Sequence, residues 1–277
     1  MLRILVNLTH ANELWGRKVV QCEYAMNFLL RIIHNASQSM VQRRGDMVNI
    51  VEEEEEDLDV PNDKSVERAE TCALDTLCLA LGLLTNLVQA VKEVKEAVRE
   101  TRMFLFLTCL IPFVHVLPIG LNLSCALKKR ACARRCTCFP TSNGLDILVN
   151  IYTIQGFKIE SSESSLPADA TEALKEADAS FLHGHLAVLF GLLMSESPEN
   201  QSAILESLPA PTSATTSSRV QKKKSGYKVK LSRLAEQARD FVAFYAAVNG
   251  HSEEGEKESK VAKSVVRFLE KQRDAAS

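Results

Sequence analysis

The feature that most constrains the fold is a seven-residue pattern with aliphatic residues at its first, third, fourth and seventh positions and usually Asn at its sixth. The copies begin at Leu2, Leu81, Leu145 and Leu186, and the last has Gly191 in place of Asn. On a helix the aliphatic positions form one stripe, which has to be buried against neighbouring helices. We therefore predict packed amphipathic helices, in which the Asn has a structural role because it can bond to the backbone of an adjacent repeat.

The spacing of the copies favours a helical-repeat fold. The copies at Leu145 and Leu186 begin 41 residues apart, which fits the roughly 40–47 residues of a HEAT or armadillo unit. Those at Leu81 and Leu145 begin 64 apart, and those at Leu2 and Leu81 begin 79 apart. Both intervals become regular if they contain insertions. We expect residues 1–277 to form an all-α, HEAT/armadillo-like helical-repeat solenoid.

Composition agrees with a helical protein that has three unusual segments. Only 11 Gly and 8 Pro are present, and 6% of the residues are aromatic, which argues against β-sandwiches and low-complexity chains. The net charge of −2 averages acidic and basic blocks that cancel. We expect an acidic loop insertion at 45–67, an apolar and Cys-rich insertion at 103–144, and a flexible basic linker at 209–228.

Periodicity and capping signals place the helices between these segments. The expected helices are Leu2–Asn7, Glu23–Gln42, Val66–Val91, Val91–Arg102, Asn143–Ile154, Asp169–Met194, Pro198–Leu208, Leu231–Val248 and Ser259–Gln272.

The segment Met103–Leu127 contains no charged residue. It is longer than the about 20 residues that span a bilayer, and basic residues follow it, as at a cytoplasmic flank. Pro112 and Pro118 within it, and the polar helices on both sides, disfavour a membrane span. Three interpretations stay open: a membrane span, a core helix or loop insertion, and an insertion absent from the working protein, such as retained non-coding sequence.

The eight Cys do not resemble a secretory disulfide framework, because the chain starts directly in an amphipathic helix. A reducing compartment is therefore expected. Cys132, Cys136 and Cys138 form a C-x3-C-x-C cluster, and thiolates bind zinc well. Its spacing matches no standard zinc finger and no His lies close by, so free thiols are favoured over a metal site.

No catalytic constellation is present in the sequence. Phosphate-loop, zinc-protease and nucleophile-elbow motifs are missing. His183 and His185 are two residues apart, so on a helix their side chains point away from each other. We therefore predict a protein that is not an enzyme and that binds no cofactor.

A basic segment runs from Arg219 to Arg233. Its lysines could contact phosphates or serve as a nuclear-import signal, although a solvated linker followed by a basic helix start is favoured. The candidates for such contacts are Lys222, Lys223, Lys224, Lys228 and Lys230.

Four segments in order resemble the wings apart-like (WAPL) family of cohesin-release factors. They are LRILVNLTHANELWG at Leu2–Gly16, LGLLTNLVQ at Leu81–Gln89, AVLFGLLMSESPENQSAILESLP at Ala187–Pro209, and the helix pair at Phe241–Leu269. The resemblance covers about two-thirds of the chain. It implies the C-terminal part of the WAPL domain, incomplete at its N-terminus, because the family's long N-terminal region has no counterpart here.

The resemblance implies a HEAT-type solenoid in the nucleus without catalytic residues. Such proteins bind cohesin subunits and cohesin-associated HEAT-repeat regulators, and they promote release of cohesin from chromatin and so regulate sister-chromatid cohesion. Contact with chromatin would be indirect, and direct DNA contact stays open. The family has no counterpart of Met103–Leu127, which favours the third interpretation of that segment.

Two other functions stay open. One is a generic armadillo/HEAT adaptor for other proteins, for instance in transport, and the other is a membrane-anchored helical protein that uses Met103–Leu127. Core and interface positions of a solenoid share one periodicity, so the sequence predicts no residue of the solenoid that contacts a partner.

Overall fold

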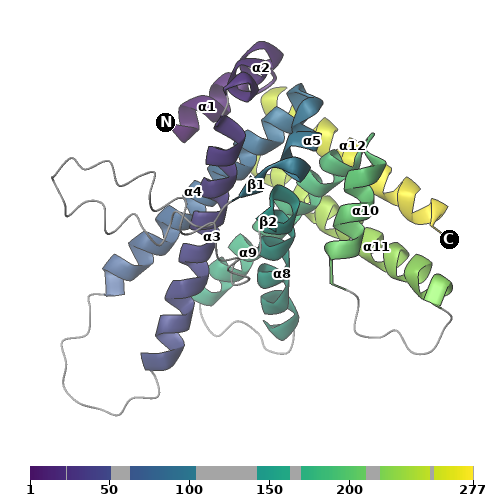
Figure 1. Cartoon of the computed structure of the whole chain (residues 1–277). Helices are drawn as coiled ribbons and strands as arrows, with labels where there is room; N and C mark the ends of the chain where they lie inside the picture. The colour runs from purple at the N-terminus through teal and green to yellow at the C-terminus, as the bar shows by residue number, and fades with distance from the viewer. Residues whose placement is uncertain are drawn as a thin grey trace, which may run out of the picture.

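The structure, a computed structural model, describes residues 1–22, 24–50, 63–103, 142–162, 170–209, 219–249 and 253–276. Within these ranges the protein is all-α, apart from one pair of two-residue strands (Figure 1). The elements in chain order are α1 (Leu2–Thr9), α2 (Glu13–Gln21), α3 (Ala25–Ile50), α4 (Asp63–Ala90), α5 (Glu93–Glu100), β1 (Arg102–Met103), β2 (Ser142–Asn143), α8 (Gly144–Ser162), α9 (Ala170–Met194), α10 (Pro198–Ser207), α11 (Arg219–Asn249) and α12 (Glu253–Ala275).

The helices pack in successive pairs. α3 lies against α4, α8 against α9, and α11 against α12. Contacts between pairs join α1 to α4, α4 to α9, and α9 to both α11 and α12, while α3 also touches α8. The chain therefore advances from α1 and α2 at one end to α11 and α12 at the other (Figure 1).

The copies of the pattern do not all mark equivalent helices. Those at Leu145 and Leu186 lie on α8 and α9, which form one packed pair. Their 41-residue spacing thus separates two neighbouring helices, not corresponding helices of successive pairs. The copies on α1, α4 and α9 do follow one another in space, since each of these helices contacts the next.

Many aliphatic positions of the pattern lie in the core. Leu81, Leu84 and Leu87 of α4 are completely buried, as are Leu186 and Leu189 of α9. Burying a Leu side chain stabilises a fold by about 1.5–3 kcal/mol relative to exposing it. The prediction that the stripe is buried is therefore confirmed for α4 and α8, and for α9 except at half-buried Leu192. It is wrong for α1, where Ile4 and Leu8 are exposed because no described helix packs on that side.

Two glycines let other helices approach α9 closely. A Cβ at Gly184 would lie 2.7 Å from Phe241 Cβ and 3.0 Å from Gln237 O of α11. A Cβ at Gly191 would clash with Val265 Cγ1 of α12. Being seven residues apart, the two glycines share one helix face. The close approach of α12 explains why Gly191 occupies the position of Asn in the fourth copy.

The acidic and basic segments are shorter than predicted. Helix α3 continues to Ile50 and α4 begins at Asp63, so the loop boundaries 45–67 are wrong at both ends, and residues 51–62 lie outside the described residues. Helix α11 begins at Arg219, so the flexible linker 209–228 is wrong over its second half. Lys, Arg and Gln are good helix formers and extend helices beyond their apolar stripe. Residues 210–218 are not described.

The insertion at 103–144 leaves and re-enters the fold at one point. Arg102 pairs with Asn143 and Met103 with Ser142 in an antiparallel ladder. Asn143 also caps α8, because its side chain accepts a hydrogen bond from Asp146 N at 2.9 Å and Asp146 Oδ2 accepts one from Asn143 N at 3.1 Å. The insertion is therefore narrower than 103–144. Residues 104–141, which contain most of Met103–Leu127, lie outside the described residues.

The paired ends predict that residues 104–141 can be removed. Joining Met103 to Ser142 through Asn-Gly gives the two-residue turn that closes a hairpin in this register. We expect an unchanged helical circular-dichroism spectrum and a free energy of unfolding raised by roughly 1–2 kcal/mol, because a shorter loop costs less entropy to close. Deleting 102–143 instead also removes the Asn143 cap and should destabilise. Loss of helical structure in the first variant would show that 104–141 supports the fold.

Candidate partner-binding surfaces and helix junctions

Asn86 of the second copy joins α4 to α1. Its Nδ2 donates to Val6 O at 3.0 Å and to Thr9 Oγ1 at 3.3 Å. Thr9 is buried and donates in turn to Leu5 O at 2.7 Å. The prediction that the Asn bonds a neighbouring helix backbone is confirmed for Asn86. By contrast, Asn7 and Asn150 have exposed side chains, so the same position serves different purposes along the chain.

Asn86→Ala should lower the free energy of unfolding by about 1 kcal/mol, because a part-buried donor to α1 is lost. The change should be seen in urea denaturation and as faster amide exchange in α1. Asn7→Ala is the matched control, since it alters the same position of the pattern at an exposed site, and it should stay within about 0.5 kcal/mol of the parent. Equal effects of the two substitutions would contradict this role of Asn86.

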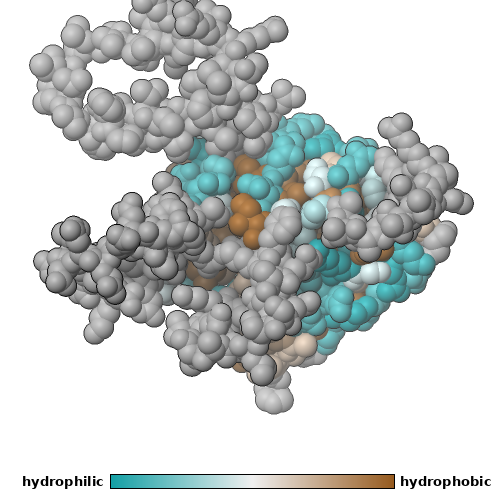
Figure 2. All heavy atoms as spheres, turned by 90° about the horizontal axis from the view of Figure 1, so that it is seen from below, coloured by the Kyte–Doolittle hydropathy of each residue, from teal (hydrophilic) through white to brown (hydrophobic). Residues whose placement is uncertain are grey.

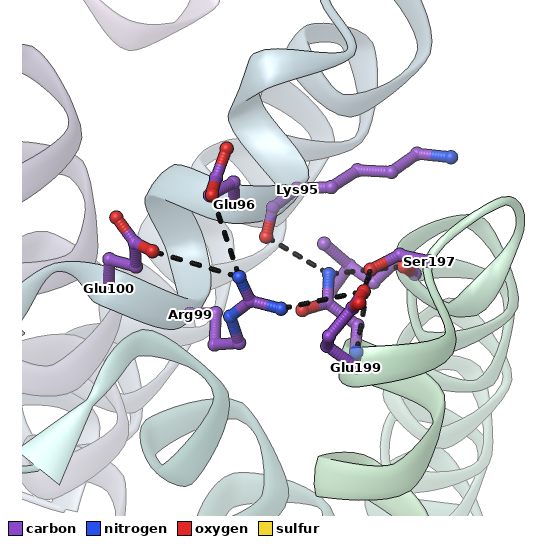
Figure 3. A network of polar contacts seen from close by, with 8 residues as sticks. Lys95, Glu96, Arg99, Glu100, Ser197 and Glu199 are labelled. Atoms are coloured by element: carbon purple, nitrogen blue, oxygen red, sulfur yellow. Dashed lines mark hydrogen bonds and ion pairs between the residues drawn. The ribbon is translucent and has the colours of Figure 1, made fainter.

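A second polar junction joins α5 to α9 and α10 (Figure 3). Asn200 is completely buried, and its Nδ2 donates to Lys95 O at 3.0 Å and to Leu193 O at 3.2 Å. Ser197 caps α10 by accepting from Asn200 N at 3.4 Å, and Pro198 follows at the first turn. The S-P-x-N sequence thus begins a helix and ties it to α5.

Charged side chains surround this junction at the surface. Arg99 of α5 lies near Glu96, Glu100 and Glu199, with N···O distances of 3.6, 3.7 and 3.8 Å (Figure 3). Lys95 Nζ donates to Ser195 O at the end of α9, and burial lowers the pKa of Lys95. The carboxylates are exposed, and such ion pairs contribute only about 0–1 kcal/mol each. Asn200 therefore holds the junction, and the charges are available to solvent and partners.

His183 and His185 face different helices, as predicted from their spacing. His183 Nε2 lies 2.8 Å from Tyr152 O of α8, whereas His185 Nε2 lies 3.2 Å from Thr85 Oγ1 of α4. Phe181 and Phe241 pack beside His185, with ring centroids 6.1 and 5.5 Å away. Burial lowers the pKa of His185 to about 4. Both imidazoles thus join helices, His183 from a buried position and His185 from a half-buried one.

The basic candidates fall into three groups. The side chains of Lys222, Lys223 and Lys224 lie outside the described part of the structure, although their backbone is in α11. Lys228 is exposed. Lys230 Nζ donates to Leu205 O at 2.7 Å, in the last turn of α10, and burial lowers its pKa. A cation is favourable at a helix C-terminus, so Lys230 stabilises the fold and Lys228 is the better candidate for an external contact.

The cysteine cluster Cys132, Cys136 and Cys138 lies outside the described residues. Among the residues that are described, no group of three or more His, Cys, Asp or Glu side chains converges on a metal position. Burial raises the pKa of Cys78 to about 11, so this thiol acts as a small apolar side chain.

Two helical segments in the described ranges have the length and apolar composition of membrane spans, Thr71–Ala90 in α4 and Ala177–Met194 in α9. Both supply completely buried Leu side chains to the core. Helices at the centre of a protein core pass the same test of length and composition, so these segments are explained by packing.

Apolar side chains also reach the surface in the described part of the chain. Figure 2 shows hydrophobic residues between hydrophilic ones on one face. The exposed large apolar side chains are Met1, Ile4, Leu8, Leu14, Trp15, Tyr24, Phe28, Val229, Phe244 and Val248. Seven of these ten lie between Met1 and Phe28, which makes the N-terminal end the more apolar surface of the described residues. The sequence pattern alone did not reveal this, because α1 has the same stripe as the buried helices.

The described residues form an all-α protein in which Asn86, His183, His185 and Asn200 join neighbouring helices. A scan against protein-family models finds no match, and a search of curated proteins finds none either.

Proposed function

We propose that the protein is a non-catalytic helical-repeat scaffold of the HEAT/armadillo type that binds other proteins. The observation that carries the proposal is the sequence of contacts from α1 to α4 to α9, with α3 and α8 packed alongside. Each pair of helices contacts mainly its neighbours, as in solenoids, which bind partners through their extended surfaces. Asn86 and the glycines of α9 serve the packing of these helices, and no cofactor takes part.

Within this class we propose a WAPL-type protein that binds cohesin and regulates its release from chromatin. Support comes from the four WAPL-like segments, which occur in the family's order. Two of them contribute the Asn side chains that join neighbouring helices, Asn86 to α1 and Asn200 to α5. These two side chains determine how neighbouring helices pack. The resemblance to the WAPL family therefore includes positions on which this architecture depends.

The proposed mechanism is differential binding. A scaffold that binds the open state of the cohesin ring more tightly than the closed state shifts the ring towards opening, without any chemical step on the scaffold. The partners are cohesin subunits and cohesin-associated HEAT-repeat regulators, and the location is the nucleus. Lys228, and the segment Lys222–Lys224, would serve nuclear import or phosphate contacts.

Co-purification of the tagged chain from nuclei after mild cross-linking tests this proposal. Enrichment of cohesin subunits over an unrelated helical-repeat control is the expected result. Enrichment of transport proteins without cohesin would instead support a generic adaptor. Retention of the chain in membranes after carbonate extraction would support a membrane-anchored protein, and either of these results would overturn the cohesin proposal.

A further inference from the structure

The solvent-facing side of α12 carries a row of cations. They are exposed, are spaced three, four and four residues apart, and are Lys260, Lys263, Arg267 and Lys271. This spacing places them along one side of the helix, in a row about 16 Å long at 1.5 Å per residue. The opposite side of α12 packs against α9 and α11 (Figure 1). We call these four residues the basic face of α12.

The acidic residues beside this face are engaged elsewhere. Between Ser259 and Ala276 the chain has only two carboxylates, those of Glu270 and Asp274. Glu270 Oε1 accepts from Arg239 Nη2 at 2.8 Å, and Asp274 Oδ1 accepts from Arg273 Nε at 2.9 Å. The described carboxylates of α12 therefore pair with arginines outside the basic face and do not neutralise it.

The row also acts against the stability of the helix. Lys263 and Arg267 are four residues apart, as are Arg267 and Lys271. Like charges at this spacing destabilise a helix, whereas alternating signs stabilise it. A face that served only to keep the helix in solution would be better served by mixed charges. The arrangement therefore suits a ligand that supplies the missing negative charge.

The chemistry of the face excludes several kinds of polyanion. The centre of a protein interface needs apolar or aromatic anchors and is poor in Lys, but none of the large apolar side chains found exposed in the described residues lies on α12. Single-stranded nucleic acids stack their bases on aromatic side chains, and Phe268 of α12 packs against the core. Proteins tell RNA from DNA through its 2′-hydroxyl, but the Ser264 hydroxyl donates to Val261 O at 2.7 Å. The face thus offers charge alone.

We propose that the basic face of α12 binds the phosphate backbone of double-stranded DNA without reading its sequence. Lys and Arg are the usual partners of DNA phosphates, and such contacts carry no sequence information. Duplex DNA has one negative charge per about 1.7 Å of its axis, so a row of this length finds a phosphate for each cation. The face is separate from the basic segment Arg219–Arg233 of α11. The inference goes beyond the proposed scaffold function and does not depend on it, because no cohesin is needed for this contact.

Fluorescence anisotropy of a labelled DNA duplex of mixed sequence, titrated with the full chain, tests the inference. The affinity of the parent should fall roughly 100-fold between about 50 and 200 mM salt, as expected for about four phosphate contacts. The test variant carries Lys263→Gln, Arg267→Gln and Lys271→Gln. It should bind roughly tenfold or more weakly at the lower salt concentration, and its slope of log K against log salt should be shallower by about 3. Arg267→Gln alone should reduce the slope by about 1.

The matched control removes the same amount of positive charge elsewhere, through Arg3→Gln, Lys18→Gln and Lys92→Gln at exposed positions. It should keep the affinity and the salt slope of the parent. Circular dichroism should show the same helical content in all variants. Equal weakening in both triple variants would mean that only net charge matters, and unchanged binding in the test variant would mean that the face is not used; either result overturns the inference. Tighter binding of duplex RNA or single-stranded DNA would also overturn it, as would displacement of the duplex by polyglutamate at equal charge concentration, since this would indicate an acidic protein partner.

Discussion

Replacing Gly184 by Ala is expected to lower the free energy of unfolding by about 3 kcal/mol. The new Cβ would lie 2.7 Å from Phe241 Cβ and 3.0 Å from Gln237 O. Neither atom can move by a change of rotamer, because one is fixed to the backbone and the other belongs to it. Helix α11 would have to shift away from α9, and overpacking of this kind costs about 1–3 kcal/mol or more. Urea denaturation measures the change.

Gly82→Ala is the matched control for this prediction. Gly82 also lies inside a helix, α4, but a Cβ there would meet nothing within 4 Å. Removing a helical glycine should then raise the free energy of unfolding by about 0.5–1 kcal/mol. If Gly184→Ala were as harmless as Gly82→Ala, the close packing of α11 on α9 would be contradicted.

Stability should fall by about 3 kcal/mol as the pH is lowered from about 6.5 to 4, through the titration of His185. Burial lowers the pKa of His185 from its ordinary value of 6.5 to about 4. Between these values the unfolded chain binds more protons than the folded protein, so acid favours unfolding. The stabilisation is therefore complete above pH 6.5 and is lost as the pH falls to 4, at 1.36 kcal/mol per unit of pKa shift.

His185→Gln tests the assignment of this pH dependence. Gln keeps a polar group for Thr85 but does not titrate, so most of the slope between pH 6.5 and 4 should disappear from the denaturation free energies. A smaller slope will remain, because burial also lowers the pKa of His34. An unchanged slope in His185→Gln would show that His185 is not the buried proton acceptor.

The helices that carry an apolar stripe were predictable from the sequence, and those without one were not. The stripe from Leu81 to Leu87 places α4 correctly, because helical periodicity requires a buried face. Helix α2 was missed because it is only nine residues long and does not carry the seven-residue pattern, although Asn12 caps it by accepting from Trp15 N. The basic start of α11 was missed because its first residues extend the helix by propensity and not by burial.

The sequence could predict which type of group a polar side chain would bond, but not which residue would supply that group. The pattern indicated that Asn86 would bond to a neighbouring backbone, but not that its acceptor is Val6 O. The sequence predicted a short helix beginning at Pro198, but not that Asn200 donates to Lys95 O, which is 105 residues away. Similarly, the sequence showed that Gly191 departs from the pattern. It did not show the cause, which is that Val265 of α12 leaves no room for a side chain at this position. Contacts between distant segments depend on how the helices pack against one another. The local spacing of residues in a single sequence does not determine this packing.

Binding to purified cohesin tests the central claim most directly. The full chain is immobilised and incubated with purified cohesin complex over a range of salt concentrations, and an unrelated helical-repeat protein of similar net charge serves as the control. The WAPL-type proposal predicts saturable retention of cohesin on the chain and none on the control. No retention even at low salt, or equal retention on both proteins, would contradict it.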